Sequence, residues 1–353
     1  MFRRWLFCLA AAPALAQPLP ERIAVRGIYS NPKPFWDKGA RLEEIGINAV
    51  FAHAGSINAD LMARAKAEGA KVYAEFPTLN GKGYVETHPE AWPVNEKGEK
   101  AAAATWFLGA CPTEPGFRAY RLKQLSELLD RYDIAGVWMD YFHWHAQFED
   151  PHPVLPETCF SPTCVAAFEK AARVKAPGRT AAEQAAWILA GHDGAWRSWR
   201  AGVLEEWARQ VRSVIESRRP GALLGVYHCP WKDEEYGGAR RRILGLDWDR
   251  LAPLVDVFSP MVYHGRMERP VEWVGEFVAW FCGRLRIGTR GRPEVWPIVQ
   301  AHNSPGVIPA AGFERAMRLG AGARATGIMV FTASAVAADP AKLDALQRLY
   351  RRR

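Results

Sequence analysis

Residues 134–145 read Ile134-Ala-Gly-Val-Trp-Met-Asp140-Tyr-Phe-His-Trp-His145. The first half of this stretch is apolar and rich in strand-forming residues, as expected of a parallel strand that is covered on both faces. Asp140 ends the apolar run, and aromatic and histidine side chains follow it. Because α/β enzymes gather their functional groups at the carboxyl ends of parallel strands, we expect Asp140 to lie at the functional end of a sheet.

The same alternation of apolar strand and amphipathic helix runs through the rest of the chain. Further strands are expected at residues 23–28, 47–53, 71–76, 222–227, 255–263, 295–299 and 328–331. Helices are expected at residues 35–45, 60–68, 115–132, 164–174, 196–217, 271–285, 312–319 and 340–350. Eight strand–helix units in order favour an α/β fold of the (β/α)8 type, a TIM barrel, over an open doubly wound sheet. Segments 78–114 and 148–193 lack steady periodicity, which predicts long loops after strands three and four.

The composition is that of a folded protein, and the first residues have the pattern of a targeting segment. Of the 353 residues 49% are hydrophobic and 24% are charged, which excludes a disordered protein. A basic start, an apolar run and Ala14-Leu-Ala16 are typical of a signal peptide at residues 1–16. We therefore expect residues 17–353 to form a single barrel domain that is periplasmic or secreted, with an uncleaved anchor as the alternative. No later stretch approaches the roughly 20 apolar residues of a membrane-spanning helix.

The net charge of +8 includes Arg240-Arg-Arg242 and Arg351-Arg-Arg353, both interpreted as solvated surfaces. No nucleic-acid motif accompanies the charge, so a nucleic-acid partner is not expected. Gly320-Ala-Gly322 follows a predicted helix instead of opening one, which argues against a phosphate-binding loop.

Five cysteines remain beyond the predicted signal peptide, at positions 111, 159, 164, 229 and 282. The odd number leaves at least one thiol without an intrachain partner. Cys159-Phe-Ser-Pro-Thr-Cys164 predicts a small disulfide loop in an oxidising compartment. A zinc knuckle is the alternative, but its spacing is loose and no second Cys or His pair follows at zinc-like distance. The sequence therefore favours the disulfide, and no metal ligands are assigned.

The predicted strand ends carry carboxylate, imidazole, phenol and amide groups. These groups belong to His53, Glu75, Asp140, Tyr141, His143, His145, Tyr227, His228, Tyr263, His264 and Gln300. Such a ring suits a polyhydroxylated ligand, whose hydroxyls need donors and acceptors and whose apolar faces stack on aromatic rings. For each residue, packing or a structural hydrogen bond at the rim of the barrel is the alternative.

Several motifs together resemble a known family. They are His88-Pro-Glu-Ala-Trp92, Cys111-Pro112 with Tyr120, Asp133 to Tyr141, Cys159 to Cys164 ahead of Phe168, and Ser259-Pro-Met-Val-Tyr-His264. In this combination the chain resembles bacterial glycoside hydrolases with a TIM barrel, of the kind named hypothetical glycosyl hydrolases, family-10-like. The resemblance covers most of the chain beyond residue 16. It implies a glycosidase, an O-glycosyl hydrolase, whose substrate is a polysaccharide or glycoconjugate.

Glycoside hydrolysis normally needs two carboxyl groups. We expect Asp140 to be the principal catalytic carboxylate. Glu75 is its expected partner because a strand end holds a group more rigidly than a loop. Loop carboxylates at Glu149, Asp233 and Glu234 are the alternatives. The sugar-binding residues are then Tyr141, His143, His145, Tyr227, His228, Tyr263, His264 and Gln300. This scheme requires no cofactor.

Two other classes of function compete with the glycosidase. A non-catalytic glycan-binding barrel is favoured if Asp140 has no second carboxylate. A metal-dependent barrel hydrolase would use His228 and His264 as ligands and Asp140 as a bridging group or base. The chain lacks the His-x-His on strand one and the aspartate on strand eight that such hydrolases carry, which counts against this class.

Overall fold

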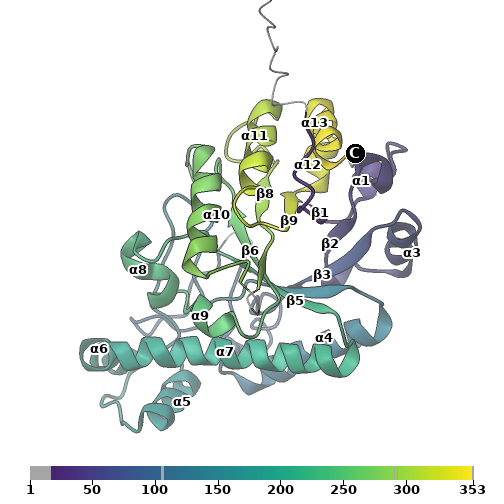
Figure 1. Cartoon of the computed structure of the whole chain (residues 1–353). Coiled ribbons are helices and arrows are strands. Elements are labelled where there is room, and N and C mark those ends of the chain that lie inside the picture. The colour runs from purple at the N-terminus through teal and green to yellow at the C-terminus, as the bar shows by residue number, and fades with distance from the viewer. Residues whose placement is uncertain (1–16, 105–106, 290, 292, 352–353) are drawn as a thin grey trace, which may run out of the picture.

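The computed structural model describes residues 17–351, apart from residues 105, 106, 290 and 292. The predicted signal peptide at residues 1–16 lies outside the described residues. Strands occupy the centre of the molecule and helices surround them (Figure 1).

Every strand pairing in the sheet is parallel, and the sheet closes on itself. The strands are β1 (Val25–Tyr29), β2 (Ala49–His53), β3 (Lys71–Pro77), β4 (Gly136–Asp140), β5 (Leu223–His228), β6 (Val257–Val262), β7 (Glu294–Val295), β8 (Ile298–Gln300) and β9 (Gly327–Phe331). Their order is β5-β4-β3-β2-β1-β9-β8-β6-β7, and the pairing of β5 with β6 closes the barrel. The short strands β7 and β8 both pair with β6, so they form one barrel strand that is interrupted at Pro297, which has no N–H to donate. The predicted (β/α)8 barrel is confirmed.

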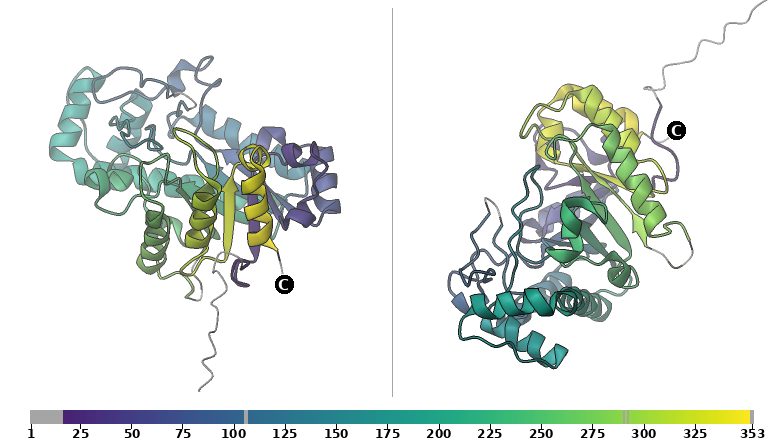
Figure 2. Two further views of the ribbon diagram at one scale, coloured as in Figure 1. Left: turned by 90° about the horizontal axis from the view of Figure 1, so that it is seen from above. Right: turned by 90° about the vertical axis from the view of Figure 1, so that its left-hand side faces the viewer.

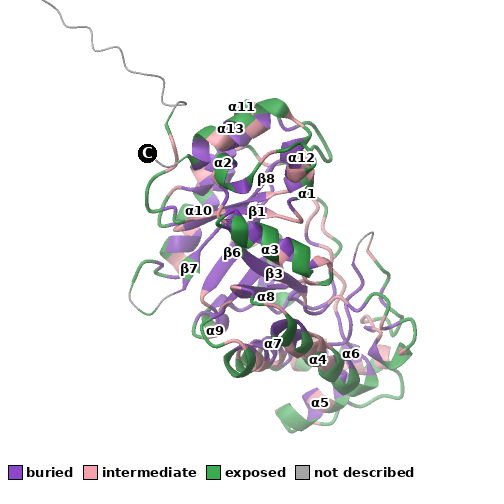
Figure 3. Ribbon diagram, turned by 90° about the vertical axis from the view of Figure 1, so that its right-hand side faces the viewer, coloured by how far each residue is buried: buried purple, intermediate pink, exposed green. Residues whose placement is uncertain are grey.

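Helices fill the connections between the strands. They are α1 (Lys33–Trp36), α2 (Leu42–Ile45), α3 (Ala59–Ala67), α4 (Pro115–Arg131), α5 (Pro162–Ala172), α6 (Ala181–Gly191), α7 (Asp193–Arg218), α8 (Glu235–Arg242), α9 (Trp248–Leu251), α10 (Glu272–Arg284), α11 (Ala310–Gly320), α12 (Ala333–Ala337) and α13 (Pro340–Tyr350). Figure 3 shows the buried strands at the centre and exposed residues on the outer faces of these helices. Among the described residues, no helix has the length and apolar character needed to cross a bilayer.

The prediction of one continuous helix at residues 35–45 is wrong. The structure divides it into α1 and α2, because Gly39 between them adopts the left-handed conformation with φ of 76°. The prediction also missed α6, α8, α9 and α12, which lie in segments expected to be loops.

The arginine run at residues 240–242 is not a solvated surface throughout. Arg240 is buried, its guanidinium lies 3.6 Å from the ring centroid of Trp248, and it donates hydrogen bonds to Leu246 and Asp233. Burial of this charge is tolerated because the guanidinium has an aromatic face, a carbonyl and a carboxylate as partners.

Aromatic rings fill the interior of the barrel. Phe51 stacks on Tyr73 with 4.8 Å between ring centroids, and Trp138 lies 5.1 Å from Tyr73 and 5.3 Å from Trp296. Glycine on the adjacent strand makes room for the largest ring, since a Cβ on Gly225 would lie 2.2 Å from the indole of Trp138. The rings therefore form a packed floor below the carboxyl end of the barrel.

A second layer of side chains lies above this aromatic floor. Residues two apart in a strand share a face and are separated by about 6.6 Å. Phe51, Tyr73 and Trp138 are thus followed on the same face by His53, Glu75 and Asp140, which lie at or near the carboxyl ends of β2, β3 and β4. The alternation that buries the aromatic floor also sets the carboxyl groups at the mouth of the barrel.

The long connections gather beside the barrel. Helices α5 and α6 pack on α7 around a separate apolar cluster that includes Phe160, Phe168 and Trp196. Figure 2 shows these helices together at one side of the molecule. This cluster explains why the segment after β4 is ordered although it lacks strand or barrel-helix periodicity.

Candidate active site

A cavity of about 240 Å³ opens at the carboxyl ends of the strands. It is lined by Tyr29, Asp140, Tyr141, Glu149, Tyr227, Met261, Tyr263, Arg266 and Phe331. These residues come from the ends of β1, β4, β5, β6 and β9 and from the loops after β4 and β6. A larger hollow of about 340 Å³ is lined by His53 and Arg121 among others, but it contains neither Asp140 nor Glu149. The smaller cavity is therefore the candidate active site.

Asp140 is the last residue of β4 and one of two carboxyl groups in the cavity lining. Its Oδ1 accepts a hydrogen bond of 2.8 Å from the backbone N–H of Tyr141, which fixes the orientation of the carboxyl group. Burial, followed by the nearby charge of Glu149, raises the pKa of Asp140 to about 7. At neutral pH this side chain can therefore hold or release a proton.

Glu149 is the second carboxyl group in the cavity lining, and it comes from the loop after β4. Its Oε2 lies 3.1 Å from Nη1 of Arg266, which follows β6. Burial raises the pKa of Glu149, and the guanidinium of Arg266 opposes that rise. The charge of Glu149 is in turn one cause of the raised pKa of Asp140.

Glu75 lies beside Asp140 but does not line the cavity. It is 1% exposed, and neither carboxyl oxygen makes a hydrogen bond of good geometry with any described residue. Burial raises the pKa of Glu75 well above its ordinary value, and the charge of Asp140 raises it further, while the phenol of Tyr29 opposes the rise. Burial and the neighbouring charge therefore both favour the protonated form of Glu75.

The surroundings of the three carboxyl groups shift their pKa values to different extents. Burial raises the pKa of all three, Arg266 opposes the rise for Glu149, Asp140 reaches about 7, and the charge of Asp140 adds to the rise for Glu75. Environments that separate the pKa values of neighbouring acids are typical of sites that perform acid–base chemistry.

Aromatic side chains form the other wall of the cavity. Phe331 lies between two phenols, with ring centroids 4.8 Å from Tyr29 and 5.0 Å from Tyr263, and Tyr227 lies 6.0 Å from Tyr29. Burial raises the pKa of each of these tyrosines, so all three keep their hydroxyl protons at neutral pH. The wall offers both apolar faces and hydroxyl groups.

The structure brings together part of the predicted site. Asp140, Tyr141, Tyr227 and Tyr263 line the cavity, and Glu75 interacts with Asp140 from outside the lining. The remaining predicted sugar-binding residues, His143, His145, His228, His264 and Gln300, do not line it.

His143 and His145 hold the loop after β4 in place. Nδ1 of His143 lies 2.8 Å from the carbonyl oxygen of Trp144. Nδ1 of His145 accepts a hydrogen bond from Gly109, and Nε2 of His145 lies 2.9 Å from the carbonyl oxygen of Ala102. The second histidine therefore ties the loop after β4 to the loop after β3.

His228 and His264 lie outside the cavity because each follows a residue that points into it. Neighbouring residues in an extended chain face opposite sides, so Tyr227 and Tyr263 take the inward positions. The ring of His228 packs against Trp248, Phe258 and Phe281, and its burial lowers the pKa to about 3. Among the described residues, these histidines do not join Asp140 in a metal-ligand cluster, so the metal-dependent alternative has no ligand set.

Gln300 braces the loops that surround the cavity. Its Oε1 accepts a hydrogen bond of 2.9 Å from the backbone N–H of Arg266, and its Nε2 donates to the carbonyl oxygens of His302 and Ser304. Gln300 therefore positions the residue that contacts Glu149 without reaching the cavity itself.

Sequence reasoning missed four of the lining residues, which are Tyr29, Met261, Arg266 and Phe331. Tyr29 ends β1 and Phe331 ends β9. Phe331 was already the last residue of a predicted strand, and extending the first predicted strand by one residue would have included Tyr29. Arg266 lies in a loop, where no periodic signal exists.

The predicted disulfide between Cys159 and Cys164 does not form in the structure, where both residues are free thiols. Helix α5 begins at Pro162, between the two cysteines, and its first turn directs Cys164 toward Cys111. The sulfur atoms of Cys111 and Cys164 are 3.3 Å apart.

Comparison with known proteins found similarity in structure alone. No family model and no curated protein matches the sequence. The PgaB (BpsB) glycoside hydrolase domain from Bordetella bronchiseptica is similar with a TM-score of 0.68 at 14% identity, over 92% of this chain and 98% of that one. The β-galactosidase from Marinomonas ef1 has a TM-score of 0.62 at 14% identity, over 87% of this chain and 54% of its own. For α-L-fucosidase isoenzyme 2 from Paenibacillus thiaminolyticus the TM-score is 0.55 at 12% identity, over 92% of this chain and 48% of its own.

The chain spans about half the length of the latter two structures. None of these comparisons bears on the family-10-like resemblance of the motifs. What they establish is a common architecture: this chain shares its TIM-barrel fold with solved glycoside hydrolases.

Proposed function

We propose that this protein is a glycoside hydrolase that cleaves glycosidic bonds in a polysaccharide or glycoconjugate, with Asp140 and Glu149 as its catalytic pair. The observation that carries this proposal is the presence of two carboxyl groups in one cavity, with one pKa raised to about 7 and the other carboxylate held by an arginine. Glycoside hydrolysis normally requires a pair of carboxyl groups of this kind. The shared fold with glycoside hydrolases is consistent with it.

Asp140 serves as the general acid in this proposal. A catalytic acid works best when its pKa lies near the operating pH, because it must be protonated and still give up its proton readily. The raised pKa of Asp140 meets this requirement at neutral pH. Its proton passes to the glycosidic oxygen, which leaves as a hydroxyl group when the bond to the anomeric carbon breaks.

Glu149 serves as the ionised carboxylate. The guanidinium of Arg266 stabilises its charge and restricts its position, since the two side chains are 3.1 Å apart. A carboxylate close to the sugar attacks the anomeric carbon directly, whereas one farther away activates a water molecule. Either route supplies the new bond at the anomeric carbon that balances the loss of the leaving group.

Glu75 acts through Asp140 in this proposal, as a positioning residue, and not as the second catalytic carboxylate expected from the sequence. The interaction with the carboxyl group of Glu75 lowers the pKa of Asp140 and so opposes the effect of burial. Glu75 thereby keeps the pKa of Asp140 from rising out of the useful range.

The aromatic wall binds the sugar. Apolar faces of sugar rings stack on Tyr29, Phe331 and Tyr263, and the phenol hydroxyls pair with sugar hydroxyls. The cavity of about 240 Å³ is smaller than the roughly 300–1,000 Å³ of pockets that enclose drug-sized ligands, so we assign it one sugar unit.

The glycan-binding alternative drew its support from the lack of a second carboxylate near Asp140, and Glu149 removes that support. The residue pattern at positions 1–16 supports export to the periplasm or beyond, with residues 17–353 as the exported domain.

A screen of wild type and Asp140→Asn against a broad panel of polysaccharides and aryl glycosides tests the proposal. Hydrolysis is measured as released reducing ends, and binding is measured on the same glycans. The matched control is Asp344→Asn, an exposed aspartate on α13. We expect wild type and Asp344→Asn to cleave at least one substrate that Asp140→Asn binds but does not cleave. If wild type and Asp140→Asn bind equally well and neither cleaves, the protein is a glycan-binding barrel.

A further inference from the structure

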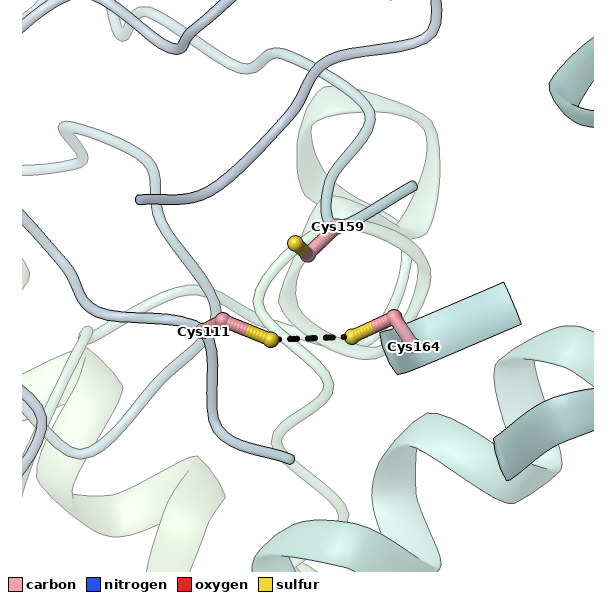
Figure 4. Close-up of side chains that lie close together, drawn as sticks. All are labelled: Cys111, Cys159 and Cys164. Atoms are coloured by element: carbon pink, nitrogen blue, oxygen red, sulfur yellow. Dashed lines mark hydrogen bonds between the residues drawn. The ribbon is translucent and has the colours of Figure 1, made fainter. Parts of the chain in front are cut away.

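Three cysteines from separate parts of the chain meet beside the barrel (Figure 4). Cys111 lies in the loop after β3, Cys159 in the loop after β4, and Cys164 is the third residue of α5. Their sulfur atoms all lie within 4.8 Å of one another, and Cys111 and Cys164 are separated by 3.3 Å. All three side chains are fully buried. We infer that this cluster is a structural metal site of three thiolates, built for Zn²⁺.

The spacing of the sulfur atoms fits a tetrahedral zinc ion. With Zn–S bonds of about 2.3 Å, tetrahedral geometry places neighbouring sulfur atoms about 3.8 Å apart. The observed separations, from 3.3 Å to no more than 4.8 Å, bracket this value, so small side-chain rotations bring all three atoms to bonding distance. A cluster of only three ligands leaves the fourth position to a water molecule or to a protein hydroxyl group.

Hydroxyl groups already surround the sulfur atoms. Oγ1 of Thr113 lies 3.2 Å from the sulfur of Cys111 and 2.9 Å from that of Cys164. Oγ of Ser161 lies 3.4 Å from the sulfur of Cys111. Thr113 is therefore placed to fill the fourth position or to hold a water molecule there. In metal sites, groups that hydrogen-bond to the ligands orient those ligands.

The surroundings stabilise negative charge on sulfur. Cys164 lies in the first turn of α5, where the helix dipole favours an anion, and the backbone N–H of Val94 donates to the sulfur of Cys159. The charges of Cys159 and Cys164 act on the buried guanidinium of Arg200, and that of Cys111 acts on Arg118. Three thiolates and Zn²⁺ carry a net charge of −1, and these two arginines offset it.

Three thiolates within 4.8 Å of one another would repel each other without a cation between them. A bound Zn²⁺ supplies the positive charge that deprotonates coordinating thiols.

The site would join the loop after β3 to the loop after β4, which contributes to the cavity. The backbone of Phe160 donates to Val94, so the segments that carry the cysteines already run side by side. The loop after β4 also carries Glu149, which precedes Cys159 along the chain. A metal ion at this position would stabilise these two loops, which do not belong to a strand or to a helix of the barrel. The sequence did not reveal the site because its third ligand, Cys111, comes from the preceding loop.

Metal content of the mature chain tests this inference independently of any enzymatic activity. The protein is purified without chelator, reconstituted with Zn²⁺ alone, dialysed, and analysed for zinc by mass spectrometry. We expect close to one zinc ion per chain for wild type and for the control Cys282→Ser, whose cysteine is also buried but lies in α10. Zinc is expected to be lost from Cys111→Ser and Cys164→Ser.

Wild-type protein alone provides a second readout in case the variants do not fold. Replacement of zinc by Co²⁺ should give the intense absorption of cobalt–thiolate bonds, and removal of the metal should expose three additional reactive thiols. Two results overturn the inference. One is a wild-type chain that binds no more zinc than Cys111→Ser after reconstitution. The other is a native disulfide between Cys111 and Cys164, seen as the loss of two hydrogen atoms from the intact mass.

Discussion

Asp140 and Glu149 line the same cavity, and the charge of Glu149 is one cause of the raised pKa of Asp140. Removing that charge should therefore lower the pKa of Asp140. In ¹³C NMR titrations of labelled aspartate, we expect the carboxyl group of Asp140 to titrate near pH 7 in wild type and at lower pH in Glu149→Gln. A wild-type midpoint in the ordinary range of aspartate, about 3.9, would contradict the electrostatic description of the site.

The pH dependence of kcat/KM should fall on the alkaline side as Asp140 loses its proton. The folded pKa of about 7 lies above the ordinary value of an aspartate, so the acid form is present below pH 7 and is lost above it. Glu149 acts as a carboxylate in this proposal, so its protonation limits activity on the acidic side. A profile measured on a responsive substrate tests this assignment, and activity that continues to rise from pH 6 to pH 9 is incompatible with Asp140 as the acid.

Substitution of the acid should matter most for poor leaving groups. Asp140→Asn is expected to lower kcat by roughly 10²–10⁴-fold on natural glycosides, the usual contribution of a general acid. On aryl glycosides with acidic phenols the loss should be much smaller, because such leaving groups depart without a proton. Comparison of the two substrate classes measures the effect, with Asp344→Asn as the control. Equal losses on both classes would assign Asp140 a role other than proton donation.

Buried Glu75 should lower stability as the pH rises. Its folded pKa is raised, so the unfolded chain ionises near pH 4.3 while the folded chain does not, and stability is lost between that pH and the folded pKa. Glu75→Gln keeps the shape of the side chain and removes this effect. We expect its Tm to exceed that of wild type by a few degrees at pH 8 and to match wild type at pH 4. A gain of equal size at both pH values would show that ionisation is not the cause.

The aromatic floor of the barrel should depend on the glycine beside Trp138. A Cβ at position 225 would lie 2.2 Å from the indole, so Gly225→Ala should reduce the free energy of unfolding by about 1–3 kcal/mol through overpacking. Adding Trp138→Phe should recover part of the loss because the smaller ring leaves room. Urea denaturation of the two single variants and the double variant measures the coupling. Additive losses would mean that Gly225 and Trp138 do not compete for space.

Strands could be predicted from the sequence because each is an apolar run that is buried on both faces. The limits of β3, β4 and β5 differ from the prediction by no more than two residues. Asp140, Tyr227 and Tyr263 were correctly placed at the mouth of the barrel for the same reason.

The rest of the site depends on contacts that periodicity does not encode. His228 and His264 were expected at the cavity, but each follows an inward-pointing tyrosine and does not line it, because neighbouring residues at a strand end face opposite sides. Glu149, Arg266 and Cys111 lie in loops, and only tertiary packing brings them to their partners. For Asp140 the sequence identified the strand end, whereas the carboxyl group that shares its cavity could be identified only from the fold.

Glu149, and not Glu75, is the proposed catalytic partner of Asp140. The most direct measurement compares kcat/KM of Glu149→Gln and Glu75→Gln on one glycoside that wild type cleaves, with exposed Glu86→Gln as the control. We predict a loss of roughly 10²-fold or more for Glu149→Gln. For Glu75→Gln we predict a loss below about tenfold with a shifted alkaline limb, since its effect passes through the pKa of Asp140. The reverse order, with Glu75→Gln inactive and Glu149→Gln near wild type, would contradict the assignment of Glu149 as the catalytic partner.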